Sequence, residues 1–248
     1  MNFIINILSW AEYIISILLG KGFGGARISL KFEVKNVMKF LSNEKLTIFD
    51  IGGNIGEYTE EILKKNINCR IFIFEPSKKN SDILKKKFRK NKNIIVENIG
   101  IDSKNRVQKL YFDKLGSPLS SLTKRSFLGS DIKMKGFEKA KFVTINKYMQ
   151  SNHINKIDLL KLDVEGHELE CLKGAINFIK KINVIQFEFG GCNIDTRTYF
   201  RDFWLFLKKY NFDLYRISPL CLVKLDTYSE RYENFLTSNF IAINKDIH

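Results

Sequence analysis

Residues 46–56 read LTIFDIGGNIG and carry the strongest structural signal in this chain. An apolar run typical of a buried strand ends at 50–51 and breaks into a turn rich in glycine and asparagine. A helix-like segment, 57–65, follows directly, and a second apolar run closes on Glu75 and Pro76. Strand, glycine turn, helix, strand and terminal carboxylate predict the first half of a nucleotide-binding βαβ unit.

The spacing of the turn residues indicates which nucleotide this unit binds. A dinucleotide fingerprint needs glycine at the first, third and sixth turn positions. Counted from Gly52, the third and sixth positions hold Asn54 and Glu57 instead. The turn fits Asp-x-Gly-x-Asn-x-Gly, ending at Gly56, which is the spacing of methyltransferases that bind S-adenosylmethionine. Glycine lets the backbone approach such a cofactor closely, and no pyrophosphate has to be held at a helix N-terminus.

Two carboxylates of this unit suit that cofactor. Asp50 can face the cationic methionine end, and Glu75 can accept both ribose hydroxyls in bidentate fashion. The alternative is a purely structural glycine turn, with Glu75 serving as a helix-start acid before Pro76. The two signals at this separation favour a cofactor site.

Length and composition bound the protein class. A chain of 248 residues is long enough for one large α/β domain, whereas two full domains would be crowded. The four cysteines and three histidines show no metal-ligand spacing, so we expect no zinc site, no disulfide framework and a reducing, cytoplasmic compartment.

The net charge of +14 is concentrated in residues 78–92. A solvated helix face explains this cluster, and the alternatives are an anionic substrate, nucleic acid or an anionic membrane surface. No nucleic-acid-binding motif accompanies the charge, so nucleic acid is not an expected partner.

The first twenty residues predict a helix with a wide apolar face and one narrow polar stripe. No basic residue precedes the apolar stretch and no cleavage site follows, which disfavours a secretory signal. Glu12 in mid-segment disfavours a membrane span. We expect residues 1–20 to contact the inner face of a membrane or a second subunit rather than pack on the domain. The expected division is 1–25 for this helix and a glycine-rich flexible link, and 26–248 for the catalytic domain.

Strands alternate with helices along most of the chain, which predicts a mostly parallel, doubly wound sheet. A less regular region lies at 107–145, and we expect 220–225 and 235–243 to form a closing antiparallel pair. The other expected strands are 46–51, 70–75, 93–97, 107–112, 140–145, 157–164, 183–189 and 213–217, and the expected helices are 28–41, 77–89, 168–180 and 197–210.

Polar residues end five of the apolar runs, at Asp50, Glu75, Asn98, Asp163 and Glu188. Ligands of open α/β sheets gather beyond these strand ends. A strand-end acid costs desolvation energy unless it has a partner, so folding alone explains this agreement poorly.

The stretch 157–175, IDLLKLDVEGHELECLKGA, closely resembles the signature of FkbM-type methyltransferases. Four further motifs match in the same order: 49–56, 74–76, 98–102 and 120–122. The resemblance covers about residues 45–243, not the N-terminal helix. It implies a class I methyltransferase (Rossmann-like) fold: a doubly wound, mostly parallel seven-stranded sheet with one antiparallel strand. It also implies S-adenosylmethionine as cofactor and a hydroxyl acceptor, commonly of a sugar or secondary metabolite.

Carried over by position, the resemblance assigns roles to individual residues. The residues expected to bind the cofactor are Asp50, Gly52, Asn54, Gly56, Glu75, Pro76, Asn98, Ile99, Gly100 and Asp163. Gly100 departs mildly from the pattern, since relatives often carry alanine or a similar small residue there. The candidates for the catalytic base are Asp163, Glu165, His167 and Glu188, and Ser120 and Ser121 could contact substrate or belong to an ordinary polar loop. We predict no metal, although Asp163 and Glu188 offer the oxygen ligands that a divalent ion prefers.

The leading functional prediction is an O-methyltransferase acting on a sugar, glycan or glycolipid intermediate of polysaccharide biosynthesis. An anionic acceptor, such as a nucleotide-linked or polyprenyl-phosphate-linked sugar, would explain the basic surface and the apolar N-terminus together. The alternatives are a catalytically silent, membrane-tethered cofactor-binding module, and methylation of a small secondary metabolite or nucleic acid. A nicotinamide-dependent oxidoreductase is disfavoured by Asn54 and Glu57 at required glycine positions.

Overall fold

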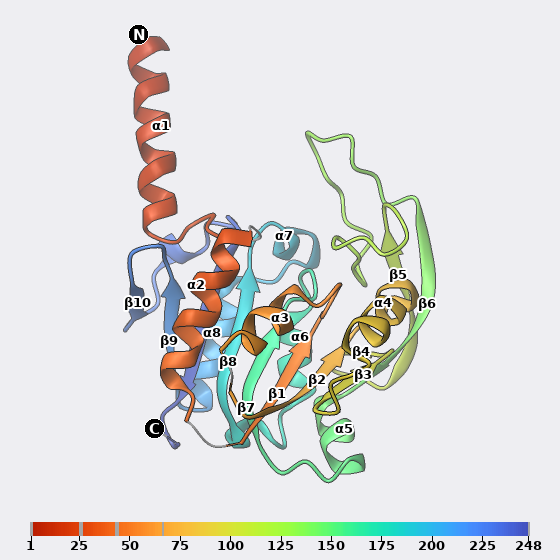
Figure 1. Cartoon of the computed structure of the whole chain (residues 1–248). Helices are drawn as coiled ribbons and strands as arrows, with labels where there is room; N and C mark the ends of the chain where they lie inside the picture. The colour runs from red at the N-terminus through yellow and green to blue at the C-terminus, as the bar shows by residue number, and fades with distance from the viewer. Residues whose placement is uncertain (1, 25–26, 43–44, 66, 248) are drawn as a thin grey trace.

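A computed structural model describes residues 2–24, 27–42, 45–65 and 67–247. One twisted sheet forms the centre, with helices on both of its faces, and a smaller sheet lies beside it (Figure 1). The expected division between residues 25 and 26 falls outside the described residues and stays a prediction.

The central sheet is mostly parallel and has one strand reversed in its interior. Across the sheet the strands are β3 (Ile94–Glu97), β2 (Cys69–Phe74), β1 (Leu46–Ile51), β7 (Ile157–Leu162), β8 (Ile182–Phe189), β11 (Ser238–Asn244), β9 (Phe212–Ile217) and β10 (Leu222–Leu225). The pairs from β3 to β8 are parallel, and β11 runs antiparallel to both of its neighbours. This confirms the expected mostly parallel architecture, in which β11 is reversed; the edge strand β10 runs in the same direction as β11. It also corrects the strand number, because β10 pairs antiparallel with β9 as an eighth strand at the edge.

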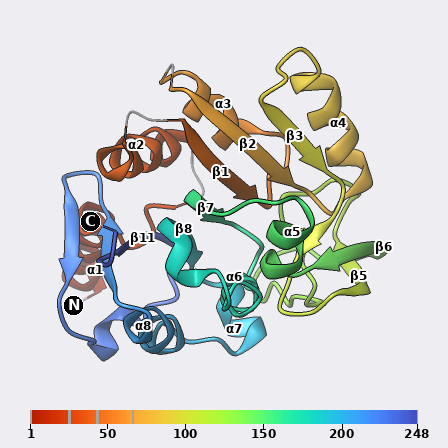
Figure 2. The same cartoon turned by 90° about the horizontal axis from the view of Figure 1, so that it is seen from below.

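Apolar side chains on the two faces of the sheet build two separate cores. Val34, Tyr58 and Leu84 belong to the core on one face, and Tyr148 and Phe203 belong to the core on the other. Figure 2 shows the two helix layers from below. The first layer holds α2 (Arg27–Val37), α3 (Glu57–Leu63) and α4 (Lys78–Phe88); the second holds α5 (Ile145–Ser151), α6 (Glu168–Lys173) and α8 (Phe200–Lys209).

The smaller sheet explains the irregular region of the sequence. Its strands are β4 (Gly100–Ile101), β6 (Gly136–Val143) and β5 (Arg106–Phe112), in that order. The expected strand 140–145 therefore begins earlier and ends at Val143, because helix α5 follows at once. The side chain of Thr144 caps that helix by accepting a hydrogen bond from the Lys147 amide, as threonine commonly does at a helix N-terminus.

Three further expectations need correction. Segments 220–225 and 235–243 do not pair with each other; β10 and β11 lie on opposite sides of β9. Helix α6 ends at Lys173 rather than at residue 180; Gly174, its C-cap, packs against the Asp102 carbonyl, where a Cβ would lie 2.3 Å from the oxygen. A short helix, α7 (Cys192–Thr196), was not expected and follows β8 directly.

Helix α1 (Asn2–Leu18) stands away from the rest of the molecule (Figure 1). Its large apolar side chains are exposed, which agrees with the expectation that it does not pack on the domain. Within the described ranges, no helix has both the length and the apolar character needed to cross a membrane.

Candidate active site

The parallel register brings several strand ends to one edge of the sheet. Ile51 at the end of β1 lies opposite Phe74 of β2 on one side and Leu162 of β7 on the other. The residues that follow these three strands therefore meet, as expected for a ligand site in an open α/β sheet.

The glycine turn after β1 is held tightly against its neighbours. The amides of Gly52 and Gly53 both donate to the Phe74 carbonyl, at 3.0 and 3.2 Å. Gly52 has φ +80°, and a Cβ there would lie 1.8 Å from the Asp163 carbonyl oxygen. Only glycine fits this position, because both the backbone conformation and the approach of β7 exclude a side chain.

Glu75 connects this turn to the end of β2. One carboxylate oxygen accepts from the Asn54 amide and the other from the Ser77 amide, each at 2.8 Å. Burial raises the pKa of Glu75 to about 7, against these two hydrogen bonds, which lower it. The carboxylate is thus fixed in place and retains lone pairs for a ligand.

A cavity opens beside this carboxylate. Its walls combine a few polar groups with apolar surface, as small-molecule sites do. These features fit S-adenosylmethionine: glycine backbone, a fixed carboxylate for ribose hydroxyls and apolar walls for a base. The lining includes the expected residues Gly52, Asn54, Glu75, Pro76, Gly100, Ser120, Ser121, Asp163, Glu165 and His167, and the unexpected Asn80, Leu110, Leu122 and Phe142.

Two residues of the glycine motif are not part of that lining. The Asp50 side chain is fully buried beneath the turn, where it accepts a hydrogen bond of 2.8 Å from Thr59. Its expected contact with the methionine end is therefore corrected to a supporting role. Gly56 faces α4, and a Cβ there would lie 2.7 Å from the ring of Phe88, so helix packing explains this glycine.

The segment after β3 also differs from expectation. Asn98 donates to the backbone carbonyls of Glu75 and Pro76, at 3.0 and 3.1 Å, and so fixes the loop that carries the carboxylate. Ile99 packs against the core. Of Asn98, Ile99 and Gly100, which were expected to bind the cofactor, only Gly100 reaches the cavity, where the ring of Phe142 covers it.

A buried lysine compensates the acids below the site. Lys161 lies 2.9 Å from Asp163 and 3.8 Å from Asp50, and its ammonium also lies over the ring of Tyr58. Burial disfavours its charged form, but Asp163, Asp50 and Glu33 together raise its pKa above the usual value. The sequence reasoning missed Lys161, although a lysine in mid-strand of an apolar run was visible.

A second, larger cavity adjoins the first. The two share Gly52, Asn54, Pro118, Asp163 and Glu165 in their walls. An acceptor molecule in this second cavity would lie next to a cofactor in the first. We call the first the cofactor cavity and the second the acceptor cavity.

Glu188, at the end of β8, lines the acceptor cavity. Among the described residues, no hydrogen bond or ion pair reaches its carboxylate. Burial, followed by the charges of Asp163 and Glu165, raises its pKa well above the usual value. Of the four candidate bases, Glu188 is the one whose carboxylate is not committed to another group.

Glu165 lies between the two cavities in a strained conformation, with φ +56°. It forms an ion pair with Arg125, which also reaches Asp195 at 3.4 Å. Burial and then the charge of Asp163 raise the pKa of Glu165 to about 8, although Arg125 opposes this shift. Its carboxylate therefore anchors the loop that carries Arg125.

The remaining candidates support the loops of the site. The His167 ring is 2.9 Å from the Thr123 hydroxyl, and burial lowers its pKa, so it is neutral at physiological pH. Ser121 donates to the Glu165 carbonyl at 2.9 Å, and Ser120 donates to the Ser117 carbonyl at 2.7 Å.

Two buried glutamates were missed as parts of the site. Glu168 accepts hydrogen bonds from the amides of Val164 and Gly166 and so holds the loop between β7 and α6. Glu33 of α2 lines the acceptor cavity and accepts from Gln186 and Asn239, at 2.8 and 3.0 Å. In the part of the chain that is described, no group of three potential metal-ligating side chains comes together.

The sequence matches a known family over most of the domain. The family model described as "Methyltransferase FkbM domain" matches residues 50–214. The chain belongs to the FkbM methyltransferase family. The matched residues of this FkbM-family chain thus form a methyltransferase domain, as the resemblance implied.

Individual relatives of this FkbM-family chain are distant. The hexuronic acid methyltransferase AglP of Haloferax volcanii is 26% identical over 148 residues, which are 59% of this chain and 57% of AglP. The chain thus aligns with little more than half of that curated relative. Among solved structures, M. capricolum TrmK with S-adenosylhomocysteine shares 13% identity and a TM-score of 0.45, covering 87% of this chain and 68% of TrmK. An rRNA methylase from Streptococcus thermophilus shares 8% identity and a TM-score of 0.48, covering 89% and 97%.

Proposed function

We propose that this methyltransferase methylates a hydroxyl group of a sugar ring, with Glu188 as the general base. The observation that carries the proposal is the uncommitted Glu188 carboxylate in the wall of the acceptor cavity, beside Asp163. A base with a raised pKa accepts a proton from a hydroxyl group more readily than an ordinary carboxylate.

One cavity would bind the methyl donor and the other the acceptor. In the cofactor cavity, Glu75, Gly52, Asn54 and Gly100 would hold S-adenosylmethionine, which supplies an electrophilic methyl group. The acceptor cavity orients the hydroxyl, and the Glu188 carboxylate takes its proton. Positioning of this kind supplies much of the rate enhancement in group transfer.

The carboxyl groups of the acceptor cavity favour a neutral ring over a carboxylate-bearing one. Acidic side chains outnumber basic ones among its described lining residues, although the whole chain carries +14. A carboxyl group can hydrogen-bond a sugar hydroxyl in either protonation state, whereas a uronate would add an anion beside Glu165 and Glu188, whose pKa values are already raised by burial and by neighbouring carboxylates. AglP, which is named for hexuronic acid, supports a sugar acceptor. Its named substrate is a uronate, however, and so differs from the neutral ring proposed here. The acidic lining residues are Glu33, Glu57, Asp163, Glu165 and Glu188; the basic ones are Lys114, Arg125 and Lys161.

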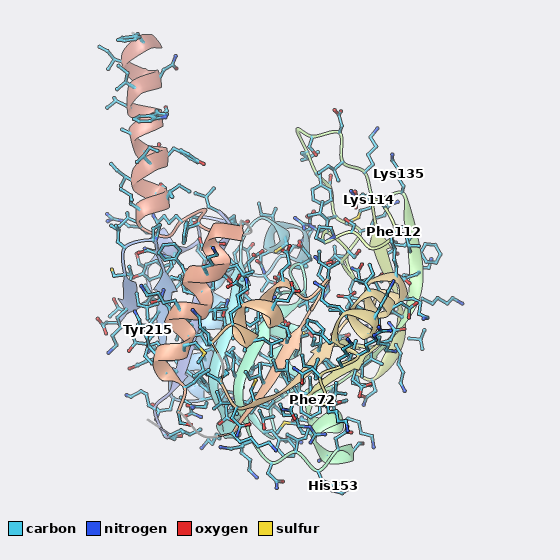
Figure 3. All side chains as sticks on the ribbon, in the orientation of Figure 1. Phe72, Phe112, Lys114, Lys135, His153 and Tyr215 are labelled. Atoms are coloured by element: carbon cyan, nitrogen blue, oxygen red, sulfur yellow. The ribbon has the colours of Figure 1, made fainter. Side chains whose placement is uncertain are left out.

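An anionic linkage on the acceptor is compatible with this arrangement if it lies at the cavity rim. Lys114 is exposed there, on the segment between β5 and β6 (Figure 3). A phosphate-linked sugar would then place its ring among the carboxylates and its phosphate near the rim lysine.

The acceptor class is tested with methyl-labelled S-adenosylmethionine and matched pairs of sugars, each pair differing only in a hydroxymethyl or a carboxylate group. We expect label in the neutral member of a pair and little in the uronate. Transfer to uronates alone would overturn the neutral-ring assignment. Transfer to a non-sugar hydroxyl alone would overturn the sugar assignment, while leaving the methyltransferase activity intact.

A further inference from the structure

Two apolar projections rise from the same side of the molecule as the active site. Helix α1 and the segment between β5 and β6 both extend beyond the edge toward which β1 and β8 run (Figure 1). That edge carries the cofactor and acceptor cavities, since their walls include the residues following β1, β7 and β8. The mouth of the site therefore lies on the side from which both projections extend.

The first projection, α1, is apolar around most of its surface. Glu12 is its sole charged residue, and Trp10 is 68% exposed. A helix that is hydrophobic over most of its circumference is stable only when another apolar phase or protein covers it. Its exposed large apolar side chains are Phe3, Ile4, Ile5, Ile7, Leu8, Trp10, Tyr13, Ile14, Ile15 and Leu18.

The base of α1 is fixed to the rim of the acceptor cavity rather than linked flexibly. The buried Arg216 donates to the Leu19 carbonyl at 2.8 Å, and Gly20 ends the helix with φ +80° against the carbonyl of Ile217. Gly24 packs on Thr237, which itself lines the acceptor cavity. The expected flexible link is thus a packed connection over residues 19–24, and it fixes where α1 leaves the domain.

The second projection is the segment 126–133, which we call the tip segment. An isolated bridge between Ser126 and Lys133 closes it. Leu128 is 92% exposed at its end, and a Cβ on the adjacent Gly129 would touch nothing within 4 Å. Just before it, Arg125 lines the acceptor cavity, so the base of this projection also belongs to the rim.

Exposed lysines surround the tip segment. Lys124, Lys133 and Lys135 are all exposed, and Figure 3 shows Lys135 with Lys114 on this side of the molecule, opposite His153. Three exposed lysines outweigh the one exposed acid of the segment, Asp131. An exposed leucine among lysines is complementary to a bilayer with anionic headgroups, because leucine enters the acyl boundary and lysine stays among phosphates. A second copy of this chain, itself strongly basic, would be repelled by the same lysines.

We propose that α1 and the tip segment dock the protein onto an anionic membrane surface, with the mouth of the acceptor cavity facing the lipid. The two projections lie on either side of the cavity, so an acceptor anchored in the bilayer would enter between them. That last consequence rests on the proposed function; the docking itself does not.

Vesicle binding tests the proposal with the full chain and native fluorescence. The two tryptophans differ usefully, since Trp10 is exposed whereas Trp204 on α8 is 9% exposed. We expect a blue shift of emission with phosphatidylserine-containing vesicles, a smaller one with phosphatidylcholine alone, and none in Trp10→Phe. Removal of residues 2–18 should abolish sedimentation with vesicles while cofactor binding persists.

The orientation needs a reporter on the tip segment. In a Trp10→Phe background, Leu128→Trp should shift on vesicle binding, whereas Ile176→Trp should not. Ile176 is a matched control because it is 45% exposed and precedes β8, at the opposite edge of the sheet. We also expect Leu128→Asp to weaken vesicle affinity about tenfold or more, and Ile176→Asp to leave it unchanged.

Each other outcome contradicts the proposal. Vesicle binding without a response at residue 128 would mean that α1 anchors the protein with the cavity turned elsewhere. Absence of vesicle binding, together with self-association that requires residues 2–18, would make α1 a contact between copies. Either result leaves the acceptor test unaffected, because that test uses soluble sugars.

Discussion

The Lys161 ammonium on β7 lies 2.9 Å from the carboxylate of Asp163, which follows that strand and lines both cavities. Asp163 is one of several acids at this edge of the sheet, and Lys161 is buried among them. Without a cation at this place, the charges of Asp50, Asp163 and Glu33 would meet in a region of low dielectric. This pair makes the acidic site compatible with a folded domain.

Replacing Lys161 with methionine should therefore destabilise the protein. We expect a loss of about 3–5 kcal/mol in the free energy of unfolding, because a buried acid cluster is left uncompensated. The neighbouring carboxylates raise the pKa of Lys161 above 10.5, so its contribution is complete at neutral pH and is lost only as pH rises through that higher value. Urea unfolding at neutral pH measures the loss. Equal stability of the variant and the parent would show that the cluster is protonated.

Glu75→Ala should weaken cofactor binding by about 2–3 kcal/mol, or roughly 30- to 150-fold in Kd, if the carboxylate accepts two ribose hydroxyls. Glu75→Gln keeps one acceptor oxygen, so its dissociation constant for the cofactor should lie between those of Glu75→Ala and the parent protein. Calorimetric titration with S-adenosylhomocysteine gives the dissociation constants, and circular dichroism controls for the loss of the amide hydrogen bonds of Asn54 and Ser77. An unchanged Kd would place the ribose elsewhere.

The glycine turn offers a test with a matched control. Gly52 and Gly129 have nearly equal φ, +80° and +79°, but only Gly52 has a neighbour within Cβ contact. Gly129→Ala should lower the free energy of unfolding by about 1–2 kcal/mol, because alanine is strained in the left-handed conformation. Gly52→Ala should cost about 3 kcal/mol or more, because the Asp163 carbonyl must also move. Equal costs in denaturant unfolding would show that β7 adapts freely to the added methyl group.

Glu188→Gln should lower kcat about 10²- to 10⁴-fold and leave cofactor affinity unchanged, since the amide cannot accept the hydroxyl proton. His167→Gln should change kcat far less, because Thr123 occupies its ring nitrogen. Once an acceptor is found, steady-state rates of both variants decide between the two residues. A larger loss in the histidine variant would reassign the base.

Stability should fall as pH rises from about 4.5 to about 8. Burial raises the pKa of Glu75 and of Glu168 to about 7 and that of Glu165 to about 8, so the folded protein binds protons that the unfolded chain has released above 4.5. The stabilising contribution of such groups is complete below their unfolded pKa and is lost as pH passes their folded pKa. Urea unfolding measures the free energy of unfolding at each pH. Near pH 8 this free energy should fall less steeply with pH in Glu165→Gln than in the parent protein. An identical dependence on pH in both proteins would mean that Glu165 ionises normally.

The sequence predicted the parts of the site that depend on chain direction and local pattern. Asp163 and Glu188 end apolar runs, and parallel strands bring such ends to one edge, so their proximity followed from the strand pattern. The pattern at 46–56 likewise predicted the turn on which the cofactor cavity is built.

The apolar pattern did not predict the direction in which a side chain at the end of a strand points. Asp50 and Glu75 both stand near the end of an apolar run, yet one lies beneath the turn with Thr59 and Lys161 while the other faces the cavity. Glu33 and Arg125 reach the acceptor cavity from positions outside the motifs. Their roles depend on packing between distant parts of the chain.

The amino-acid sequence by itself determined the family, the cofactor class and the apolar character of α1, because each is encoded in residues close together along the chain. Tertiary structure alone decided that Lys161 compensates the acids of the site and that the acceptor cavity is acidic in a basic protein. It also decided that α1 leaves the domain at the rim of that cavity. Electrostatic balance and surface orientation arise from side chains that only folding brings within a few ångströms of one another.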